Sequence, residues 1–376
     1  MTVPQQAHST CTIPGDYAQR PPLVILSDRR ESKDLRTDLT ADVPEVRRSF
    51  DSGLRPALRM TDILRIRRSI LRILNAHRGT VITVPYIDFT ERGNIMGIYS
   101  DVLLTVDFDR TLTAPDSSIP ERNLEAIRYF IDNGGVFTVN TGRSVPMYSS
   151  HLELVPVNAP LLLYNGSAAY DKERREFTFA TPIDLDMVDT LKKTMELFPD
   201  CAVELQGMEH HYLFTPNAGW AAYNEHNRCP YAFCNLDEAP GPFLKFTLYG
   251  EFRDVTVADL YNGSAAEFAR FDEIHKELEA VFGDKCVVFR AANRIIDIHA
   301  KGVSKAKSAR RLQAELGRKI LVCVGDGEND VSMMNDADYA FCPGDAIIRD
   351  RFENVCNCAD GAVADVIYKK IPEILG

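Results

Sequence analysis

Short runs of apolar residues mark the chain from about residue 100 onward. Val102 to Val106, Val136 to Val139 and Ile320 to Val324 are short and rich in β-branched side chains. Runs of this kind predict strands buried on both faces, as in a parallel sheet, rather than helices. A helical pattern over 306–316 precedes the last of these runs. The pattern therefore predicts an α/β fold built on a parallel sheet.

The stretch between about residues 182 and 299 has a different pattern, in which strands and helices are mixed. Helices are expected over 184–197 and 265–282, and strands over 202–205, 242–249, 286–290 and 294–299. This mixture predicts a compact α+β insertion with an antiparallel sheet.

Two aspartates, Asp107 and Asp109, directly follow the first predicted strand. Open α/β sheets bind their ligands at the carboxyl ends of the strands. Because successive strand residues alternate faces, we expect both carboxylates to point into one shared pocket. A pair of this kind suits a nucleophile or metal ligand beside a proton carrier, although an Asp-x-Asp turn alone equally describes a solvated acidic loop.

Three further motifs occur at the ends of predicted elements. They read Asn140-Thr141-Gly142-Arg143-Ser144, Gly302-Val303-Ser304-Lys305 and Gly325-Asp326-Gly327-Glu328-Asn329-Asp330. Together with Asp107-Phe108-Asp109-Arg110-Thr111, and in this order, they resemble the haloacid dehalogenase superfamily of phosphohydrolases. The segment Leu163-Tyr164-Asn165-Gly166-Ser167 is similar to the strand ending in Asn-Gly of the Cof-type branch, which contains sugar-phosphate and related phosphatases.

The resemblance covers about residues 96 to 376 and implies a domain organisation. A doubly wound, Rossmann-like core would comprise residues 96–181 and 300–376, and an α+β cap would comprise residues 182–299. The cap would close over the site, select the leaving group and exclude bulk water.

The resemblance also implies roles for the acidic residues. Asp107 would be the nucleophile that attacks phosphorus and forms an aspartyl-phosphate. Asp107, the backbone carbonyl of Asp109 and Asp326 would bind Mg²⁺, with Asp330 in or near the same shell. Mg²⁺ suits such a site because it binds carboxylate oxygens together with waters and phosphate oxygens.

Asp109 would be the general acid and base, protonating the leaving oxygen and later accepting a proton from water. This role requires some protonated carboxyl near neutral pH, and we expect nearby carboxylates to raise the pKa of Asp109 accordingly. Thr111 has a simpler expected role, in which its hydroxyl holds the turn after the strand.

Thr141 and Lys305 would complete a clamp for the phosphoryl group. A hydroxyl followed by Gly142 allows close approach to a phosphoryl oxygen, and Lys305 offers a charge near a helix N-terminus, where anions bind well. Lys301 is the competing lysine, but Lys305 matches the motif spacing. Four more residues are expected to contact the substrate or brace the loops: Arg143, Asn165, Gly166 and Asn329.

Zinc is a second possible metal in the cap. The imidazole and thiol side chains that suit it are those of His210, His211, His226, Cys229 and Cys234. Their spacing is irregular and there is no second cysteine pair nearby, which argues against a structural zinc site. Trp220 is expected to pack within the cap or on its substrate face.

Length and composition are consistent with this interpretation. A chain of 376 residues should form two or three domains, and a net charge of -11 argues against a nucleic-acid surface. We find no apolar run long enough to span a membrane, and the first 30 residues lack the layout of a signal peptide. The nine scattered cysteines fit reduced thiols, so we expect a cytoplasmic location.

Residues 1–95 differ from the rest, with 14 Arg and one Lys against 11 acidic residues. The start is rich in Pro, Gln, Ser and Thr and is expected to be disordered, whereas 63–74 could form an Arg-rich amphipathic helix. The extension could pack on the phosphatase, act in targeting, or not belong to the working protein. In the last case translation would start at Met96.

The sequence therefore predicts a Mg²⁺-dependent phosphatase that hydrolyses small phosphorylated metabolites, such as sugar phosphates, through an aspartyl-phosphate. A sugar phosphomutase would use the same aspartates, and a non-catalytic protein that binds a phosphorylated ligand is the alternative from another class. The sequence does not identify the substrate or the oligomeric state, because fold-level similarity does not specify either.

Overall fold

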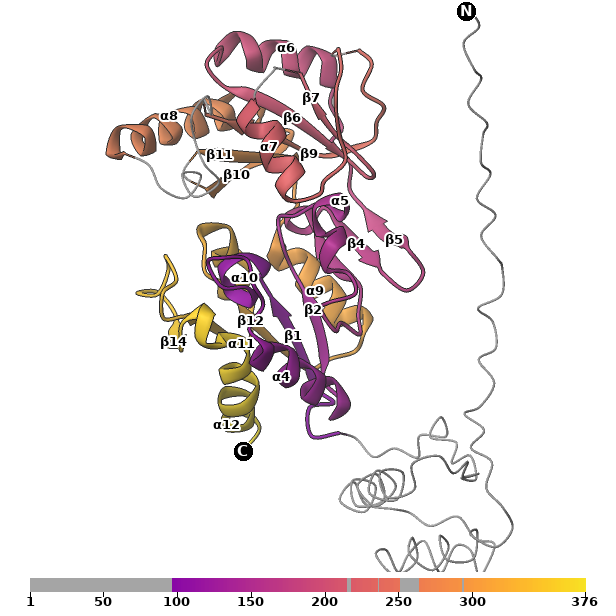
Figure 1. Ribbon diagram of the computed structural model, residues 1–376, viewed down its shortest axis with the longest axis vertical. Coiled ribbons are helices and arrows are strands. Elements are labelled where there is room, and N and C mark those ends of the chain that lie inside the picture. The colour runs from indigo at the N-terminus through magenta and orange to yellow at the C-terminus, as the bar shows by residue number, and fades with distance from the viewer. Residues whose placement is uncertain (1–96, 215–217, 236, 251–263, 293) are drawn as a thin grey trace, which may run out of the picture. The chain divides into compact units, whose positions relative to one another are not determined.

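The computed structural model describes residues 97–214, 218–235, 237–250, 264–292 and 294–376 (Figure 1). The predictions for residues 1–95, including the helix over 63–74, lie outside this range, as does Met96. Within the described residues, no helix combines the length and apolar character needed to cross a membrane.

A five-stranded parallel sheet forms the first part of the fold, with strand order β14-β13-β12-β1-β2. The strands are β1 (Val102–Val106), β2 (Val136–Val139), β12 (Ile320–Val324), β13 (Tyr339–Pro343) and β14 (Glu353–Val355). The three strands predicted from apolar runs are confirmed at the expected residues. β1 lies between β2 and β12, so the chain order reverses beside it, and ligands bind at such a point in open α/β sheets.

Helices cover both faces of this sheet, as the doubly wound prediction requires. Leu104 and Val106 of β1 pack in one apolar cluster with Ile127 and Phe130 of α4 (Glu121–Asp132). Leu103, which points to the other face, packs in a second cluster that includes side chains of α9 (Lys305–Glu315) and α10 (Val331–Asp336). Alternate residues of one buried strand thus contact helices on opposite sides.

Shorter elements complete this part of the fold. A three-stranded antiparallel sheet is formed by β3 (Leu161–Leu163), β4 (Ala168–Asp171) and β5 (Glu176–Ala180). The short helices are α5 (Val145–Tyr148), α11 (Ala362–Asp365), α12 (Ile371–Leu375), η1 (Phe108–Leu112), η2 (Ser149–His151), η3 (Tyr164–Gly166), η5 (Glu328–Asp330), η6 (Cys358–Asp360) and η7 (Val366–Lys370). The three-stranded sheet was not predicted beyond the strand that ends in Asn-Gly.

A second sheet, with strand order β10-β11-β9-β6-β7-β8, lies between β5 and α9 in the chain and forms the cap. Its strands are β6 (Ala202–Gly207), β7 (His211–Leu213), β8 (Tyr231–Phe233), β9 (Phe243–Tyr249), β10 (Cys286–Ala292) and β11 (Ile295–Ala300). All neighbours are antiparallel except β7 and β8. The α+β insertion is therefore confirmed, although β7, β8 and α7 (Ala218–His226) were not predicted.

The cap sheet has one apolar and one polar face. Apolar side chains of β6, β9 and β11 pack with α6 (Met187–Leu197) and α8 (Ala265–Phe282). The alternate residues of the same strands are polar yet buried: Glu204, Gln206, Lys245, Thr247, Asp297 and His299. Because buried polar groups require partners, these side chains must pair with one another or with polar groups that oppose this face.

Candidate active site

Asp107 follows β1 directly and is buried, with 6% of its surface exposed. Its backbone amide still donates to the carbonyl of Val324 in the neighbouring strand β12. The chain then leaves the strand direction and enters the short helix η1, within which Arg110 lies in the left-handed region at φ 59°. The alternation of strand residues therefore ends at Asp107.

The loop after β12 folds around Asp330. Its Oδ2 accepts hydrogen bonds from the backbone amides of Asp326 (3.1 Å) and Gly327 (3.0 Å). Gly325 permits this close approach, because a Cβ atom there would lie 2.5 Å from Cβ of Asp330. The loop thereby holds Asp326 and Asp330 at the carboxyl end of β12.

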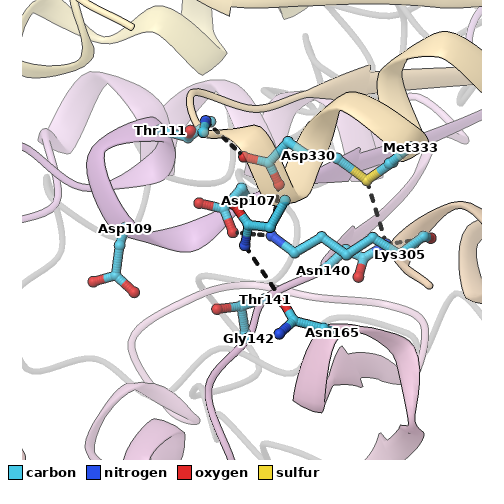
Figure 2. A network of polar contacts seen from close by, with 12 residues as sticks. Asp107, Asp109, Thr111, Asn140, Thr141, Gly142, Asn165, Lys305, Asp330 and Met333 are labelled. Carbon is cyan, nitrogen blue, oxygen red and sulfur yellow. Dashed lines mark hydrogen bonds and ion pairs between the residues drawn. The ribbon is translucent and has the colours of Figure 1, made fainter. Parts of the chain in front are cut away.

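Lys305 reaches this loop from the first residue of α9, where Ser304 caps the helix. Its Nζ donates to Oδ1 of Asp107 and to Oδ1 of Asp330, both at 2.6 Å, and the residue is buried (Figure 2). The competing lysine, Lys301, is exposed and donates to the carbonyl of Gly283 instead. The lysine favoured by motif spacing is thus the one beside the carboxylates.

Three buried carboxylates meet at this point. One oxygen from each of Asp107, Asp326 and Asp330 lies within 4.8 Å of the other two. Thr111 donates to Oδ1 of Asp326 at 3.1 Å, so its hydroxyl links two loops rather than holding only its own turn. The strand end, the loop after β12 and α9 together build one acidic site.

The charge of this acidic site is only partly balanced. Burial, followed by the nearby charge of Asp330, raises the pKa of Asp107 well above its usual range, although Lys305 opposes the shift. Burial, followed by the charges of Asp107 and Asp330, likewise raises the pKa of Asp326. Clustered carboxylate oxygens with a surplus of negative charge are the groups that a hard divalent cation such as Mg²⁺ binds. The three aspartates therefore fit the expected metal.

The carboxylate of Asp109 does not join this acidic site, and the expectation that nearby carboxylates raise its pKa is wrong. Figure 2 shows its carboxylate apart from Asp107 and Lys305. Both of its oxygens accept hydrogen bonds from Arg143, from Nε and Nη2 at 2.8 Å each. Burial alone would raise the pKa of Asp109, but the charge and hydrogen bonds of Arg143 outweigh it and lower that pKa. The neighbour that determines the shift is a cation, not a carboxylate.

The Thr-Gly-Arg loop follows β2, and its Thr141 and Arg143 are buried. Oγ1 of Thr141 accepts a hydrogen bond from the backbone amide of Arg143 at 3.2 Å. The carbonyl of Gly142 accepts one from Nζ of Lys245, on cap strand β9, at 3.0 Å. Thr141 thus braces the loop, and the cap contacts the loop directly.

The Asn-Gly segment after β3 lies against the same loops. Oδ1 of Asn165 accepts a hydrogen bond from Nδ2 of Asn329 at 3.4 Å. Gly166 has φ 92°, and a Cβ atom there would lie 2.4 Å from the carbonyl oxygen of Ser304. Asn165 and Asn329 therefore contact each other, and Gly166 allows α9 to approach closely.

The polar face of the cap supplies residues that the sequence analysis missed. Nδ2 of Asn165 donates to Oδ2 of Asp297 (3.1 Å) and lies 3.2 Å from Nε2 of His299. Lys245 also donates to Oδ2 of Asp297, at 3.1 Å. The available signal was the alternation of polar and apolar residues over 244–248 of β9 and 296–300 of β11, because a two-residue period places the polar side chains on one face.

A second group of cap residues contacts the core at Ser144. Oγ of Ser144 lies 2.7 Å from Nε2 of His211, whose Nδ1 lies 2.7 Å from Oε1 of Glu204. All three residues are buried. His211 is thus engaged by a hydroxyl and a carboxylate. Among the described residues, the acidic site is the one group of three or more His, Cys, Asp or Glu side chains whose ligand atoms lie within 4.8 Å of one another.

Comparison with known proteins identifies the class of protein. The sequence matches the family of haloacid dehalogenase-like hydrolases over residues 104–359. The chain therefore belongs to this family. It is 25% identical over 273 residues to the uncharacterized hydrolase C215.10 of Schizosaccharomyces pombe, covering 68% of this chain and 84% of that protein. It is 23% identical over 250 residues to the 5-amino-6-(5-phospho-D-ribitylamino)uracil phosphatase YcsE of Bacillus subtilis, covering 65% and 84%.

Solved structures confirm the fold. A haloacid dehalogenase-like hydrolase from Bacteroides thetaiotaomicron aligns with TM-score 0.59 and 19% identity, covering 72% of this chain and 99% of that chain. The sugar phosphatase BT4131, of subclass IIB of the same superfamily, aligns with TM-score 0.58 and 18% identity, covering 72% and 99%. The predicted core with an inserted cap is therefore the architecture of this chain.

Proposed function

We propose that the protein is a Mg²⁺-dependent phosphatase that acts through an aspartyl-phosphate on Asp107. The observation that carries this proposal is the buried contact of Lys305 with Asp107 and Asp330 at the carboxyl ends of β1 and β12. At this position the carboxylate can attack the phosphorus of a phosphate ester, while the neighbouring cation attracts the negatively charged phosphoryl group.

In the first half of the reaction, an oxygen of Asp107 attacks phosphorus while the bond from phosphorus to the leaving oxygen breaks. Lys305 balances negative charge on the phosphoryl oxygens. Asp107, Asp326 and Asp330, together with the backbone carbonyl of Asp109, would hold Mg²⁺, which supplies further positive charge at the phosphoryl group when bound. Thr141 would donate its hydroxyl hydrogen to a phosphoryl oxygen.

Asp109 is proposed to move the protons of both halves of the reaction. It gives a proton to the leaving oxygen in the first half and takes one from the attacking water in the second. Arg143 favours the ionised carboxylate, so the arrangement described matches the second half. The first half requires Asp109 to take up a proton before the leaving group departs.

The substrate is proposed to be a small phosphorylated metabolite, and the cap its selecting element. Cap residue Lys245 contacts Gly142, and Asp297 contacts Asn165, so cap side chains reach the loops of the core site. Arg143, Asn165, Gly166 and Asn329 are proposed to contact the substrate or hold those loops. Similarity to a sugar phosphatase and to a phosphoribitylaminouracil phosphatase supports phosphorylated sugars and sugar alcohols as the first compounds to test.

We also propose a cytoplasmic location and no nucleic-acid partner. The eight described cysteines are all free, as in a reducing compartment. The net charge of -11 opposes binding to phosphate backbones.

The test is phosphate release from a panel of phosphorylated metabolites with Mg²⁺, with Asp107→Asn as the control. We expect release that disappears in EDTA and in the variant. Activity that requires a bisphosphate activator and transfers phosphate within the sugar would instead establish a phosphomutase. A folded protein that binds the phosphorylated compounds but releases no phosphate from any of them would contradict the proposal.

A further inference from the structure

Arg143 connects the proposed acid/base residue to the cap. Its Nε and Nη2 bind both oxygens of Asp109, and its Nη1 donates to Oδ1 of Asn227 at 3.2 Å. Asn227 directly follows α7 of the cap. A chain of hydrogen bonds therefore runs from the cap, through one guanidinium, to the carboxylate of Asp109.

The guanidinium of Arg143 has two further contacts outside the cap. Nη1 of Arg143 also donates to the carbonyl of Met147 at 3.4 Å, and its central carbon lies 5.0 Å from the centre of the Phe108 ring. The side chain of Arg143 is 9% exposed, whereas that of Asp109 is 32% exposed. Asp109 is thus accessible to a water molecule while the group that orients it is enclosed. Bidentate pairs of arginine and carboxylate fix direction as well as position.

We propose that Asn227 is a positioning residue that acts through Arg143 to set Asp109 for hydrolysis of the phosphoenzyme. The inference rests on the proposed function and concerns its second half. There a water oxygen attacks phosphorus, and the bond from phosphorus to Asp107 breaks with its electron pair returning to the Asp107 carboxylate. The water proton passes to Asp109, whose orientation toward that water depends on Arg143.

The location of Asn227 makes this step dependent on the cap. Its Oδ1 accepts a hydrogen bond from Arg143, and its Nδ2 donates to the carbonyl of Tyr223 at 2.9 Å, which fixes Asn227 at the end of α7. The cap in the position described therefore completes the support of Asp109, and a displaced cap would remove the contribution of Asn227 to it. Hydrolysis of the phosphoenzyme would be fastest when the cap lies where Asn227 accepts the hydrogen bond from Arg143.

The test uses p-nitrophenyl phosphate, whose leaving group needs little protonation and therefore isolates the second half. For Asn227→Ala we expect kcat to fall about 10-fold, within the range of general base catalysis. KM should fall by a similar factor, so that kcat/KM changes by less than about 2-fold. Rapid mixing should show a burst of about one p-nitrophenol per active site, because the phosphoenzyme accumulates.

Matched variants separate this role from a structural one. Asn227→Asp keeps the acceptor for Arg143 but loses the donor to Tyr223, so it should stay within about 3-fold of the wild-type kcat. Glu225→Gln alters an exposed residue of α7 that bonds Tyr231 and should leave kcat and KM unchanged. Asn227→Leu, which keeps side-chain volume without polar atoms, replaces the alanine variant if that variant does not fold.

Each outcome decides the inference. A burst with parallel loss of kcat and KM in Asn227→Ala, restored by Asn227→Asp, would support it. An unchanged kcat, a loss confined to kcat/KM, or equal loss in both variants would overturn the inference while leaving the proposed function intact. No p-nitrophenol release by the wild-type enzyme with Mg²⁺ would overturn the proposed function and this inference together.

Discussion

The protein buries acidic side chains in both the core and the cap, and the two regions differ in how many partners balance the negative charge. In the core, three carboxylates meet around the single ammonium group of Lys305. In the cap, the carboxylate of Glu204 receives hydrogen bonds from four side chains: His211, Asn224, Gln206 and Tyr249. The core therefore has too few partners for its charge, whereas the cap surrounds one charge with donors.

The pKa values express this difference. Burial and neighbouring carboxylates raise the pKa of Asp107. Burial alone would also raise the pKa of Glu204, but the charge and hydrogen bond of His211, with the hydrogen bonds of Tyr249 and Gln206, lower it to about 2. Burial of an acid is thus a weak indicator of function, and the balance of its partners is the better one.

The largest expected effect separates activity from stability in the core. Asp107→Asn should lower phosphate release by about 10⁴-fold or more, because an amide cannot form the aspartyl-phosphate. The same change removes a charge from a site with surplus negative charge, so the free energy of unfolding without Mg²⁺ should stay equal or rise. Steady-state kinetics and urea unfolding in EDTA measure the two effects. A variant that loses stability together with activity would show that the charge of Asp107 is already balanced.

Glu204→Gln should have the reverse effect in the cap. The neutral amide places an NH₂ group against donors that now have no acceptor, at a cost of about 3 kcal/mol of unfolding free energy. Urea unfolding at pH 7 measures this loss. Glu225→Gln is the control, since that exposed carboxyl bonds only at the surface and should change stability by less than about 0.5 kcal/mol. Equal stability of the two variants would contradict the contrast between core and cap.

Addition of Mg²⁺ should stabilise the protein through the acidic site of the core and not through the cap. Mg²⁺ at 100 times its Kd should stabilise the folded protein by about 2.7 kcal/mol, because it binds the folded acidic site and not the unfolded chain. Asp326→Asn should abolish this shift, and Glu204→Gln should retain it in full despite its lower starting stability. Thermal unfolding with and without Mg²⁺ measures the shift. An undiminished shift in Asp326→Asn would place the metal elsewhere.

The sequence predicted the elements whose burial is continuous. β1, β2 and β12 were predictable because their apolar, β-branched runs fit a strand covered on both faces. β7 and β8 were missed because each has only three residues, too few to show an alternating or a continuous apolar pattern. α6 starts three residues later than expected, because the side chain of Asp186 caps the helix by accepting from the amide of Asp189.

The site was predictable to the extent that it lies at strand ends. Asp107, Asp326 and Asp330 come together because their loops follow neighbouring strands of one sheet, and Lys305 reaches them from the first residue of α9. The partner of Asp109 was not predictable, since β1 ends at Val106 and the short helix η1 begins at Phe108, so strand alternation does not extend to Asp109. The contacts between the cap and the core loops were not predictable either, because strand periodicity shows that one face of the sheet is polar but not which groups lie opposite it.

The smallest expected effect concerns His299 and acid. Burial, and secondarily the charge of Lys245, lower the pKa of His299 from 6.5 to about 3 despite the opposing charge of Asp297. Its Nε2 faces the amide nitrogen of Asn165, and Nδ1 lies 3.2 Å from the carbonyl of Leu244, an arrangement that requires a neutral ring. As pH falls through 6.5, His299 therefore binds a proton in the unfolded chain but not in the folded protein. The free energy of unfolding consequently decreases from about pH 6.5 down to about pH 3.

Between pH 7.5 and 5.5 this loss amounts to about 1.4 kcal/mol, and Glu204 does not contribute because its unfolded pKa lies near 4.5. The core carboxylates act with the opposite sign, since their raised pKa values favour the folded state as pH falls, so the comparison is made with saturating Mg²⁺. His299→Asn should be less stable at pH 7.5 yet lose about 1.4 kcal/mol less than the wild-type protein over this interval. Urea unfolding at the two pH values measures the difference. Identical losses in both proteins would mean that His299 accepts a proton without disturbing the cap, and that the polar face of the cap is less tightly satisfied than its contacts indicate.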